Sequence, residues 1–185
     1  MANGKRQERP NYKKIEDLVI DHARILNVNF KGADKWGYNP KHERGFWLAL
    51  DPERFDLDAI RDDGWNLKTK EPREGYEDNG PLYYIPIKVR WDNFPPVIYL
   101  LTRAGGTDEN PRYRRTKMDE EASFEIDDAR IERVDLEVRP SHYDVNGNQG
   151  IAAYLKKMYI IIEEDKLDKM YSFVDDYDDD EIPFD

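Results

Sequence analysis

The feature that most constrains this fold is a series of short segments in which apolar and polar side chains alternate. The two clearest segments are 82–91 and 97–103, and the five residues 92–96 join them at a distance typical of a hairpin. The same pattern is present at 24–31, and further strands are predicted at 45–50, 131–139 and 151–163, the last of which ends in the β-branched run 160–162. Asn146-Gly147 predicts a tight turn between the last two segments. The chain is therefore expected to form five or six strands.

The remaining segments predict long loops and little helix. Residues 32–44 and 68–81 are rich in turn-forming residues, and 104–117 is a polar, arginine-bearing stretch that we interpret as a loop. Asp56 can cap a short helical turn that Gly64 would end, and a second turn is indicated near 127–130. We expect an all-β fold with one or two short helices. An antiparallel Greek-key barrel like the oligonucleotide-binding (OB) fold is the natural candidate.

Charge divides the chain into three parts. Residues 1–14 carry five basic side chains and one acidic one, which is typical of a flexible basic arm. Residues 15–173 form the predicted single domain. Residues 174–185 hold seven of the eleven excess negative charges, which leaves −4 on the other 173 residues. The net charge of −11 therefore does not exclude a nucleic-acid partner, because most of it lies in a tail that we expect to be disordered.

Other compositional features narrow the classes of function. The chain has no cysteine and only three scattered histidines, so no metal motif is present and we predict no cofactor. It has no run of about 18 apolar residues that could span a membrane, and no apolar stretch of signal-peptide type follows the amino terminus. A cytoplasmic location and no membrane partner are the resulting expectations. Pairing of barrel edges to give a homodimer is a further option.

Aromatic residues recur beside basic ones in three separate segments, and this combination is what a general binder of single strands needs. Aromatic rings stack on exposed bases, while Lys and Arg neutralise phosphates. We predict that the segments around 35–44, 84–90 and 113–115 contact single-stranded DNA. The candidate residues are Lys35, Trp36, Tyr38, Arg44, Tyr84, Lys88, Arg90, Tyr113, Arg114 and Arg115. An aromatic within a strand, such as Trp47 or Tyr159, is more often part of a core, and we expect both there.

Enzymatic chemistry has weaker support, and we predict no catalytic residue. The stretch 104–107 lacks the lysine and the spacing of a phosphate-binding loop. The acidic pairs at 62–63 and 127–128 could ligate Mg²⁺, but Asp is also favoured in turns and helix caps. Two alternatives remain open. One is an acidic protein that mimics nucleic acid and binds a host enzyme, and the other is a metal-dependent DNA-processing factor.

The tail carries the most specific motif of the chain. Its acidic run is followed by a short apolar tip, which suits docking into a basic-rimmed pocket on another protein. The tip residues are Asp178, Asp179, Asp180, Glu181, Ile182, Pro183 and Phe184. They resemble the carboxyl-terminal tip of bacterial single-stranded DNA-binding proteins, which implies recruitment of replication or recombination proteins. In that family the phenylalanine is the last residue, whereas Asp185 follows it here. The tail could also compete with DNA for the basic groove.

The body of the chain resembles a different group. Segments 31–34, 44–50, 85–91 and 150–155 are similar to single-stranded DNA-binding proteins of tailed phages and prophages. This resemblance covers most of residues 20–165. It implies an OB-type domain that binds single-stranded DNA without sequence preference, and a role in DNA replication or recombination.

Overall fold

A computed structural model describes residues 11–163, so the first ten residues of the predicted arm and the whole acidic tail lie outside the described residues. Within these described residues, nine strands and three short helices follow one another. The strands are β1 (Leu18–Ile20), β2 (Arg24–Asn29), β3 (Gly45–Ala49), β4 (Lys68–Lys70), β5 (Leu82–Lys88), β6 (Val97–Gly106), β7 (Pro111–Met118), β8 (Ile131–Val145) and β9 (Asn148–Ile162). The helices are α1 (Leu57–Asp63), η1 (Glu77–Asn79) and η2 (Ala122–Asp128). The all-β prediction is confirmed.

The sheet closes on itself through a bend in its first strand. Hydrogen bonding gives the order β1-β8-β9-β5-β3-β2, with β4 and β6 attached along β5 and β9, and β7 on β6. The two strands at the ends of this order, β1 and β2, are separated in the chain by only Asp21, His22 and Ala23. The backbone N–H of Ala23 donates to Val134 O at 2.7 Å and holds this bend against β8. β1 and β2 are thus halves of one bent strand, and the predicted OB-like barrel follows.

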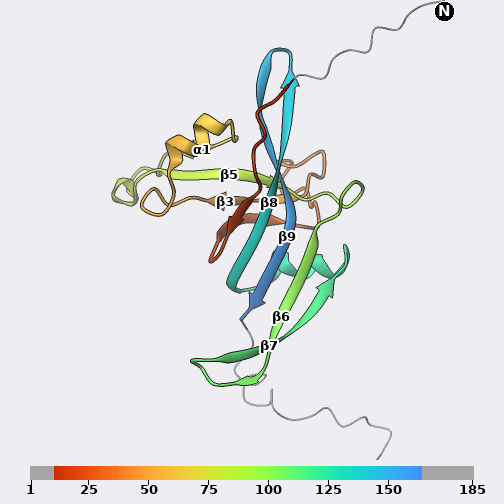
Figure 1. Ribbon diagram of the computed structural model, residues 1–185. Helices are drawn as coiled ribbons and strands as arrows, with labels where there is room; N and C mark the ends of the chain where they lie inside the picture. Colours follow the sequence, from red (N-terminus) through yellow and green to blue (C-terminus); the bar gives the residue numbers. More distant parts are fainter. Residues whose placement is uncertain (1–10, 164–185) are drawn as a thin grey trace, which may run out of the picture.

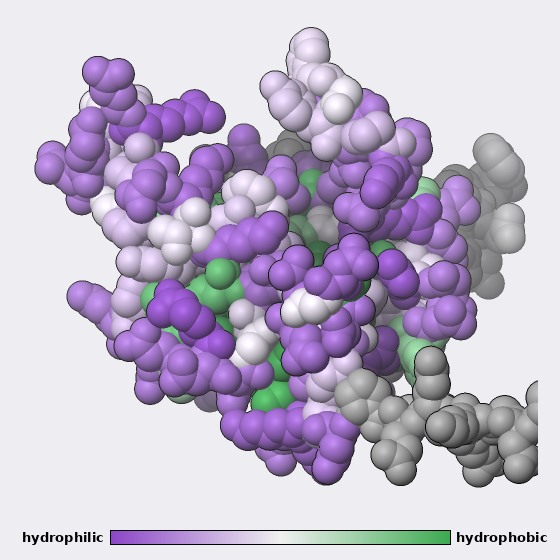
Figure 2. Space-filling view, turned by 90° about the horizontal axis from the view of Figure 1, so that it is seen from above, coloured by the Kyte–Doolittle hydropathy of each residue, from purple (hydrophilic) through white to green (hydrophobic). Residues whose placement is uncertain are grey.

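The core lies inside this barrel. Alternate residues of β3, β5, β8 and β9 point inward, as a strand with one buried face requires. The most deeply buried side chains are Phe30, Leu48, Ile85, Ile87, Ile98, Ile126, Val134, Val138, Ile151, Leu155, Met158 and Ile160. Seen from above, the surface is largely hydrophilic and its apolar side chains form small patches (Figure 2). No helix within residues 11–163 is long and apolar enough to cross a membrane.

The short helix α1 forms where the sequence predicts it. The carboxylate of Asp56 accepts a hydrogen bond from the backbone N–H of Ala59 at 3.1 Å, which satisfies one of the free amides of the first turn. Gly64 ends the helix in the left-handed conformation, with φ of 98°. The second turn, predicted near 127–130, overlaps only the last two residues of the 3₁₀-helix η2, which begins earlier, at Ala122. The Asn146-Gly147 turn joins β8 and β9 into a long hairpin, which projects beyond the barrel (Figure 1).

The predicted hairpin between 82–91 and 97–103 is wrong. β5 and β6 do not pair with each other; both run parallel to β9, one after the other along the same edge. Lys88 pairs with Tyr154 and Val97 pairs with Lys157. The nine-residue step from Lys88 to Val97 therefore corresponds to a step of only three residues along β9. Residues 92–95 are exposed in the loop between the two strands and Pro96 is buried, and the chain keeps its direction across this loop. These two parallel pairings also make the sheet mixed, whereas a wholly antiparallel one was expected.

Two predicted loops contain strands. The stretch 104–117 holds most of β7, which pairs with β6 from Ile98↔Met118 to Gly106↔Pro111. Its sequence gave no apolar alternation because residues 112–117 are exposed on both faces, so charged residues are tolerated along the whole strand. The stretch 68–81 contains the three-residue strand β4, which pairs with β5, and the 3₁₀-helix η1. β1 was also not predicted, since three residues are too few to establish a period.

Candidate nucleic-acid interface

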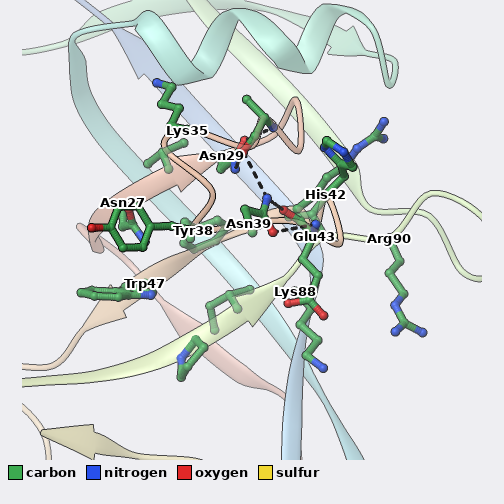
Figure 3. A pocket seen from close by; sticks show the side chains of 18 of the residues that line it. Asn27, Asn29, Lys35, Tyr38, Asn39, His42, Glu43, Trp47, Lys88 and Arg90 are labelled. Carbon is green, nitrogen blue, oxygen red and sulfur yellow. Dashed lines mark hydrogen bonds between the residues drawn. The ribbon is translucent and has the colours of Figure 1, made fainter.

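A groove of about 850 Å³ opens on the outer side of β2, β3 and β5 and is bounded by the loop 32–44 (Figure 3). Aromatic side chains lie at one end, where Tyr38 and Trp47 face the groove, and basic ones lie at the other, where Lys88 and Arg90 extend (Figure 3). The full lining is Asn27, Val28, Asn29, Ala33, Lys35, Trp36, Tyr38, Asn39, His42, Glu43, Arg44, Gly45, Phe46, Trp47, Pro86, Ile87, Lys88, Val89 and Arg90.

The loop over this groove is held in place by its own amide side chains. Nδ2 of Asn39 donates to the carbonyl oxygens of Ala33 (3.2 Å) and Glu43 (2.9 Å), while Oδ1 of Asn39 accepts from the N–H of Glu43 (3.0 Å). Asn29 makes a reciprocal pair with Ala33, at 2.9 Å in each direction. The ring nitrogen Nδ1 of His42 donates to Gly32 O at 2.9 Å. The loop is therefore shaped before any ligand binds.

The tip of the loop exposes two large aromatic rings. Trp36 is 91% exposed and Tyr38 is 88% exposed, far more than a ring that contributes to a core. Trp36 also has a φ of 63°, a left-handed conformation that is unusual for a bulky residue and is found most often at functional sites. An exposed ring held by a strained backbone loses little freedom when a base stacks on it. These two residues are the strongest stacking candidates.

A second aromatic surface lies on the barrel wall. Trp47 of β3 stacks on Tyr84 of β5, with ring centroids 4.2 Å apart and an angle of 19° between the planes. Nζ of Lys70 lies 5.4 Å from the centroid of the Trp47 ring. Trp47 was expected in the core, but alternation along β3 buries its neighbours Phe46 and Leu48 and turns Trp47 outward. The run of three apolar residues concealed this alternation in the sequence.

Glycine at position 45 lets β3 approach β5 closely beneath the basic end of the groove. A Cβ added to Gly45 would lie 2.1 Å from the carbonyl oxygen of Ile87, closer than any real contact. Gly45 pairs with Lys88, the last residue of β5, and Arg90 follows two residues later. The side chains of Lys88 and Arg90 are both exposed. Their predicted face is confirmed, since Ile85, Ile87 and Val89 are buried on the other side of the same strand.

Arg44 lines the groove but is already occupied. Its guanidinium forms an ion pair with the carboxylate of Glu120 and lies 5.2 Å from the centroid of the Phe124 ring. The Arg44 side chain is 27% exposed, and these contacts attach the groove wall to η2. Arg44 must leave Glu120 before it can contact a phosphate.

The ten predicted residues thus fall into two groups. Lys35, Trp36, Tyr38, Arg44, Lys88 and Arg90 line one groove, and Tyr84 adjoins it through Trp47. Tyr113, Arg114 and Arg115 lie instead on β7, whose hairpin with β6 extends away from the groove (Figure 1). The sequence did not indicate that Asn27 and Trp47 line the groove or that Lys70 lies beside Trp47. Asn27 lies at a β-bulge with φ of 51°, and Lys70 lies in a strand too short to recognise from sequence.

The acidic pairs considered for Mg²⁺ serve mainly as structural contacts. The carboxylate of Asp127 accepts from the backbone N–H groups of Phe30 (2.5 Å) and Lys31 (3.0 Å), which ties β2 to η2. Nζ of Lys31 donates to Asp128 at 3.0 Å, and this hydrogen bond lowers the pKa of Asp128 below its usual value. Asp63 pairs with Lys13 at 3.0 Å. Between residues 11 and 163, no group of three or more His, Asp or Glu side chains is arranged to hold a metal ion.

Comparison with known proteins gives structural neighbours and a family. The fold is similar to that of the single-stranded DNA-binding protein from bacteriophage Enc34 in a C-terminal truncation, with a TM-score of 0.44 and 12% sequence identity. The match covers 80% of this chain and 87% of that one. No curated protein sequence matches the chain. The model of a family described as a putative phage ssDNA-binding domain matches residues 7–184, and the chain therefore belongs to this family.

Proposed function

We propose that this chain coats single-stranded DNA without sequence preference and holds the strand in the groove bounded by β2, β3 and β5. The observation that carries the proposal is the convergence of aromatic and basic residues from two distant sequence segments. Trp36 and Tyr38 come from the loop 32–44, while Lys88 ends β5 and Arg90 follows it. Membership of the phage ssDNA-binding family supports the same function.

Binding follows from two kinds of contact. A base that stacks on an exposed ring such as Trp36 contributes about 1–3 kcal/mol, and any base can do so because each one has an aromatic face. Phosphates bind Lys35, Lys88 and Arg90, whose charges release counterions when the strand arrives, so affinity falls as salt rises. Stacking does not depend on the identity of the base, so a groove that binds through rings and charges binds DNA of any base sequence.

The acidic tail gives this activity a second component. Residues 174–185 carry seven acidic side chains and no basic one, together with the apolar tip from Ile182 to Phe184. The tip docks on a replication or recombination protein of the phage or its host, in the host cytoplasm. When no DNA is bound, the negative charge of the same tail occupies the basic end of the groove.

A direct titration tests the main proposal. The full chain is added to fluorescent oligo-dT and to a duplex of equal length at two salt concentrations, with anisotropy as the readout. We expect binding to oligo-dT that is stronger than binding to the duplex and that weakens at the higher salt. Absence of binding at low salt would overturn the proposal and favour a nucleic-acid mimic. Degradation of the oligonucleotide in the presence of Mg²⁺ would favour a DNA-processing factor.

A further inference from the structure

We propose that single-stranded DNA has a second binding surface on the outer face of β6, β7 and β9, separate from the groove. This hairpin platform consists of Tyr99, Tyr113, Arg115, Lys117, Lys157 and Tyr159. The inference rests on the proposed function, because it extends the path of the same ligand. It explains why the densest basic cluster of the described chain lies on a strand that does not reach the groove.

Strand β9 turns the relevant side chains outward. Met158 and Ile160 are buried in the core, so Tyr159 between them and Lys157 before Met158 face away from it. Tyr99 of β6 pairs in register with Tyr159, and Ile98 beside it is also fully buried. Tyr159 was expected in the core, but alternation along β9 places its ring on the outer face.

The two tyrosines form a stack that is capped by cations. The ring centroids of Tyr99 and Tyr159 are 5.2 Å apart, with 25° between the planes. Arg115 Cζ lies 4.9 Å from the centroid of Tyr99, and Lys157 Nζ lies 5.3 Å from that of Tyr159. The pattern of rings and cations is the one that the groove shows at Trp47, Tyr84 and Lys70.

Strand β7 supplies further charge on the same face. Register pairs place Lys117 opposite Tyr99, Arg115 opposite Leu101 and Tyr113 opposite Arg103. Tyr113 is 40% exposed. Arg112 and Arg114 alternate with these residues and therefore point to the other side of β7. Arg115 therefore has arginine neighbours on the same strand, Arg112 and Arg114, that face the other side.

Acidic neighbours leave the platform cations available. Asp135 and Glu137 of β8 lie opposite Tyr159 and Lys157, but Asp135 is paired with Arg133. Glu137 and Asp17 both bind Nζ of Lys156, at 2.9 and 2.6 Å. Among the residues that the structure describes, Arg115, Lys117 and Lys157 form no ion pair. Their charges therefore suit a polyanion, and the rings beside them favour one that carries bases.

The groove and the platform are connected across the barrel wall. Gly45 pairs with Lys88, and Lys88 pairs with Tyr154 of β9, so the three positions form one row across three strands. Arg90 Cζ lies 5.3 Å from the centroid of the Tyr154 ring. From Tyr154 the outer face of β9 continues to Lys157 and Tyr159. A single DNA strand that leaves the basic end of the groove thus meets β9 and follows its outer face toward the platform.

An exposed ring lies near this junction. Phe94, in the loop between β5 and β6, is 77% exposed and has a φ of 54°. Arg139 Cζ lies 5.1 Å from its ring centroid, and Arg139 pairs in register with Tyr154. A bulky apolar side chain in a left-handed conformation at the surface is costly for a protein without a ligand there. Phe94 is placed to stack on a base between the two surfaces.

Binding at the platform requires only side-chain movement. A base replaces Arg115 on the outer face of Tyr99, or Lys157 on the outer face of Tyr159. The displaced cation is long and flexible, and it moves to the neighbouring phosphate. No bond is made or broken, and the strands keep their positions.

A length series separates the two surfaces. Fluorescent dT oligomers from about 6 to about 30 nucleotides bracket the roughly 4–16 nucleotides that one OB fold covers. The full chain is compared with the double variant Tyr99→Leu/Arg115→Gln, and Arg112→Gln is the control with equal charge loss on the same strand. Thermal unfolding is measured for all three proteins, so that any loss of stability is known.

We expect the double variant to bind the shortest oligomers normally and the long ones roughly 5- to 100-fold more weakly, the equivalent of one lost base stack. Its salt dependence for long oligomers should also fall by about 0.7 in log–log slope, the value for one phosphate contact on a single strand. Arg112→Gln should match the parent at every length.

Other outcomes count against the platform. Equal affinity of parent and double variant at all lengths would overturn the inference while leaving the proposed function intact. Equal weakening at all lengths would also overturn it, because the platform would not be a separate segment of the path. Loss of binding to a peptide of the sequence 174–185, with DNA binding unchanged, would assign the surface to the chain's own acidic tail and overturn the inference. Failure of the parent to bind any oligomer would instead overturn the proposed function.

Discussion

Trp47 and Tyr84 stack across neighbouring strands with their ring centroids 4.2 Å apart, on the outer wall of a barrel whose inner wall is filled by the residues on either side of Trp47. The pair comes from β3 and β5, which are far apart in the chain and adjacent in the sheet. It gives the groove a packed aromatic surface on the barrel wall, in addition to the exposed rings of Trp36 and Tyr38. The groove therefore combines stacked rings on its wall with exposed rings on the loop 32–44.

The exposed ring of Trp36 can be removed without disturbing the core. Trp36→Ala should weaken binding of short oligo-dT roughly 5- to 100-fold, the equivalent of about 1–3 kcal/mol for one stack. The temperature of unfolding should stay the same, because Trp36 is 91% exposed. Anisotropy titration and a thermal melt give the two readouts. Tyr76→Ala is a matched control, since Tyr76 is also exposed (64%) and does not line the groove. Unchanged affinity in Trp36→Ala would remove the loop from the binding site.

The basic end of the groove should set the salt dependence. Lys88→Gln and Arg90→Gln should each reduce the slope of log affinity against log salt by about 0.7, the value for one phosphate on a single strand. Arg61→Gln is the control, because Arg61 is exposed on α1 and pairs with Asp58. Titration of the same oligomer at four salt concentrations measures the slopes. A slope that stays constant in both groove variants would show that the phosphates bind elsewhere.

The ion pair with Glu120 occupies the Arg44 guanidinium. Glu120→Gln should release the Arg44 guanidinium and raise the affinity for oligo-dT at low salt, whereas Arg44→Gln should not raise it. The double variant should behave like Arg44→Gln, because the effect of Glu120 acts through that arginine. The cost in stability should be small, about 0.2–1 kcal/mol, as for other partly exposed pairs. Lower affinity in Glu120→Gln would mean that the ion pair shapes the groove instead.

The close approach of β3 and β5 requires glycine at position 45. Gly45→Ala should lower the free energy of unfolding by about 1–3 kcal/mol, because the added methyl group overlaps the carbonyl oxygen of Ile87. Chemical denaturation measures this change. Gly75→Ala is a comparison without such an overlap, since nothing lies within 4 Å of a Cβ there, although its φ of 88° adds backbone strain. No loss in Gly45→Ala would show that β3 and β5 shift to accommodate the methyl group.

Removal of residues 174–185 should tighten DNA binding at low salt, because seven negative charges that compete with phosphates are lost. The difference should fade at high salt, where such interactions are screened. Titrations of the full and the shortened chain at both salt concentrations measure it. A variant with the acidic residues of the tail changed to Asn and Gln keeps its length and serves as the control for charge. Equal affinity of all three proteins at low salt would count against competition by the tail.

Much of the fold was predictable from local patterns. Short apolar or alternating segments predicted β2, β3, β8 and β9, and Asp56 and Gly64 predicted the limits of α1, because these signals depend on neighbours within one or two turns of chain. Alternation along 82–91 placed Lys88 at the end of β5, and Arg90 just after it, on the outer face. The loop aromatics Trp36 and Tyr38 were also identified, since a loop offers little to bury a large ring.

Other features depend on which strands become neighbours. The parallel pairing of β5 and β6 with β9, the strand β7 and the outward position of Trp47 all arise from contacts between distant segments, whose energies no local window contains. Residue patterns within short windows were enough to indicate an all-β chain with separated aromatic and basic clusters and an acidic end. That two of these clusters share a groove while the third lies on the β6–β7 hairpin depends on the folded sheet, because sheet order, not position in the chain, sets which side chains meet.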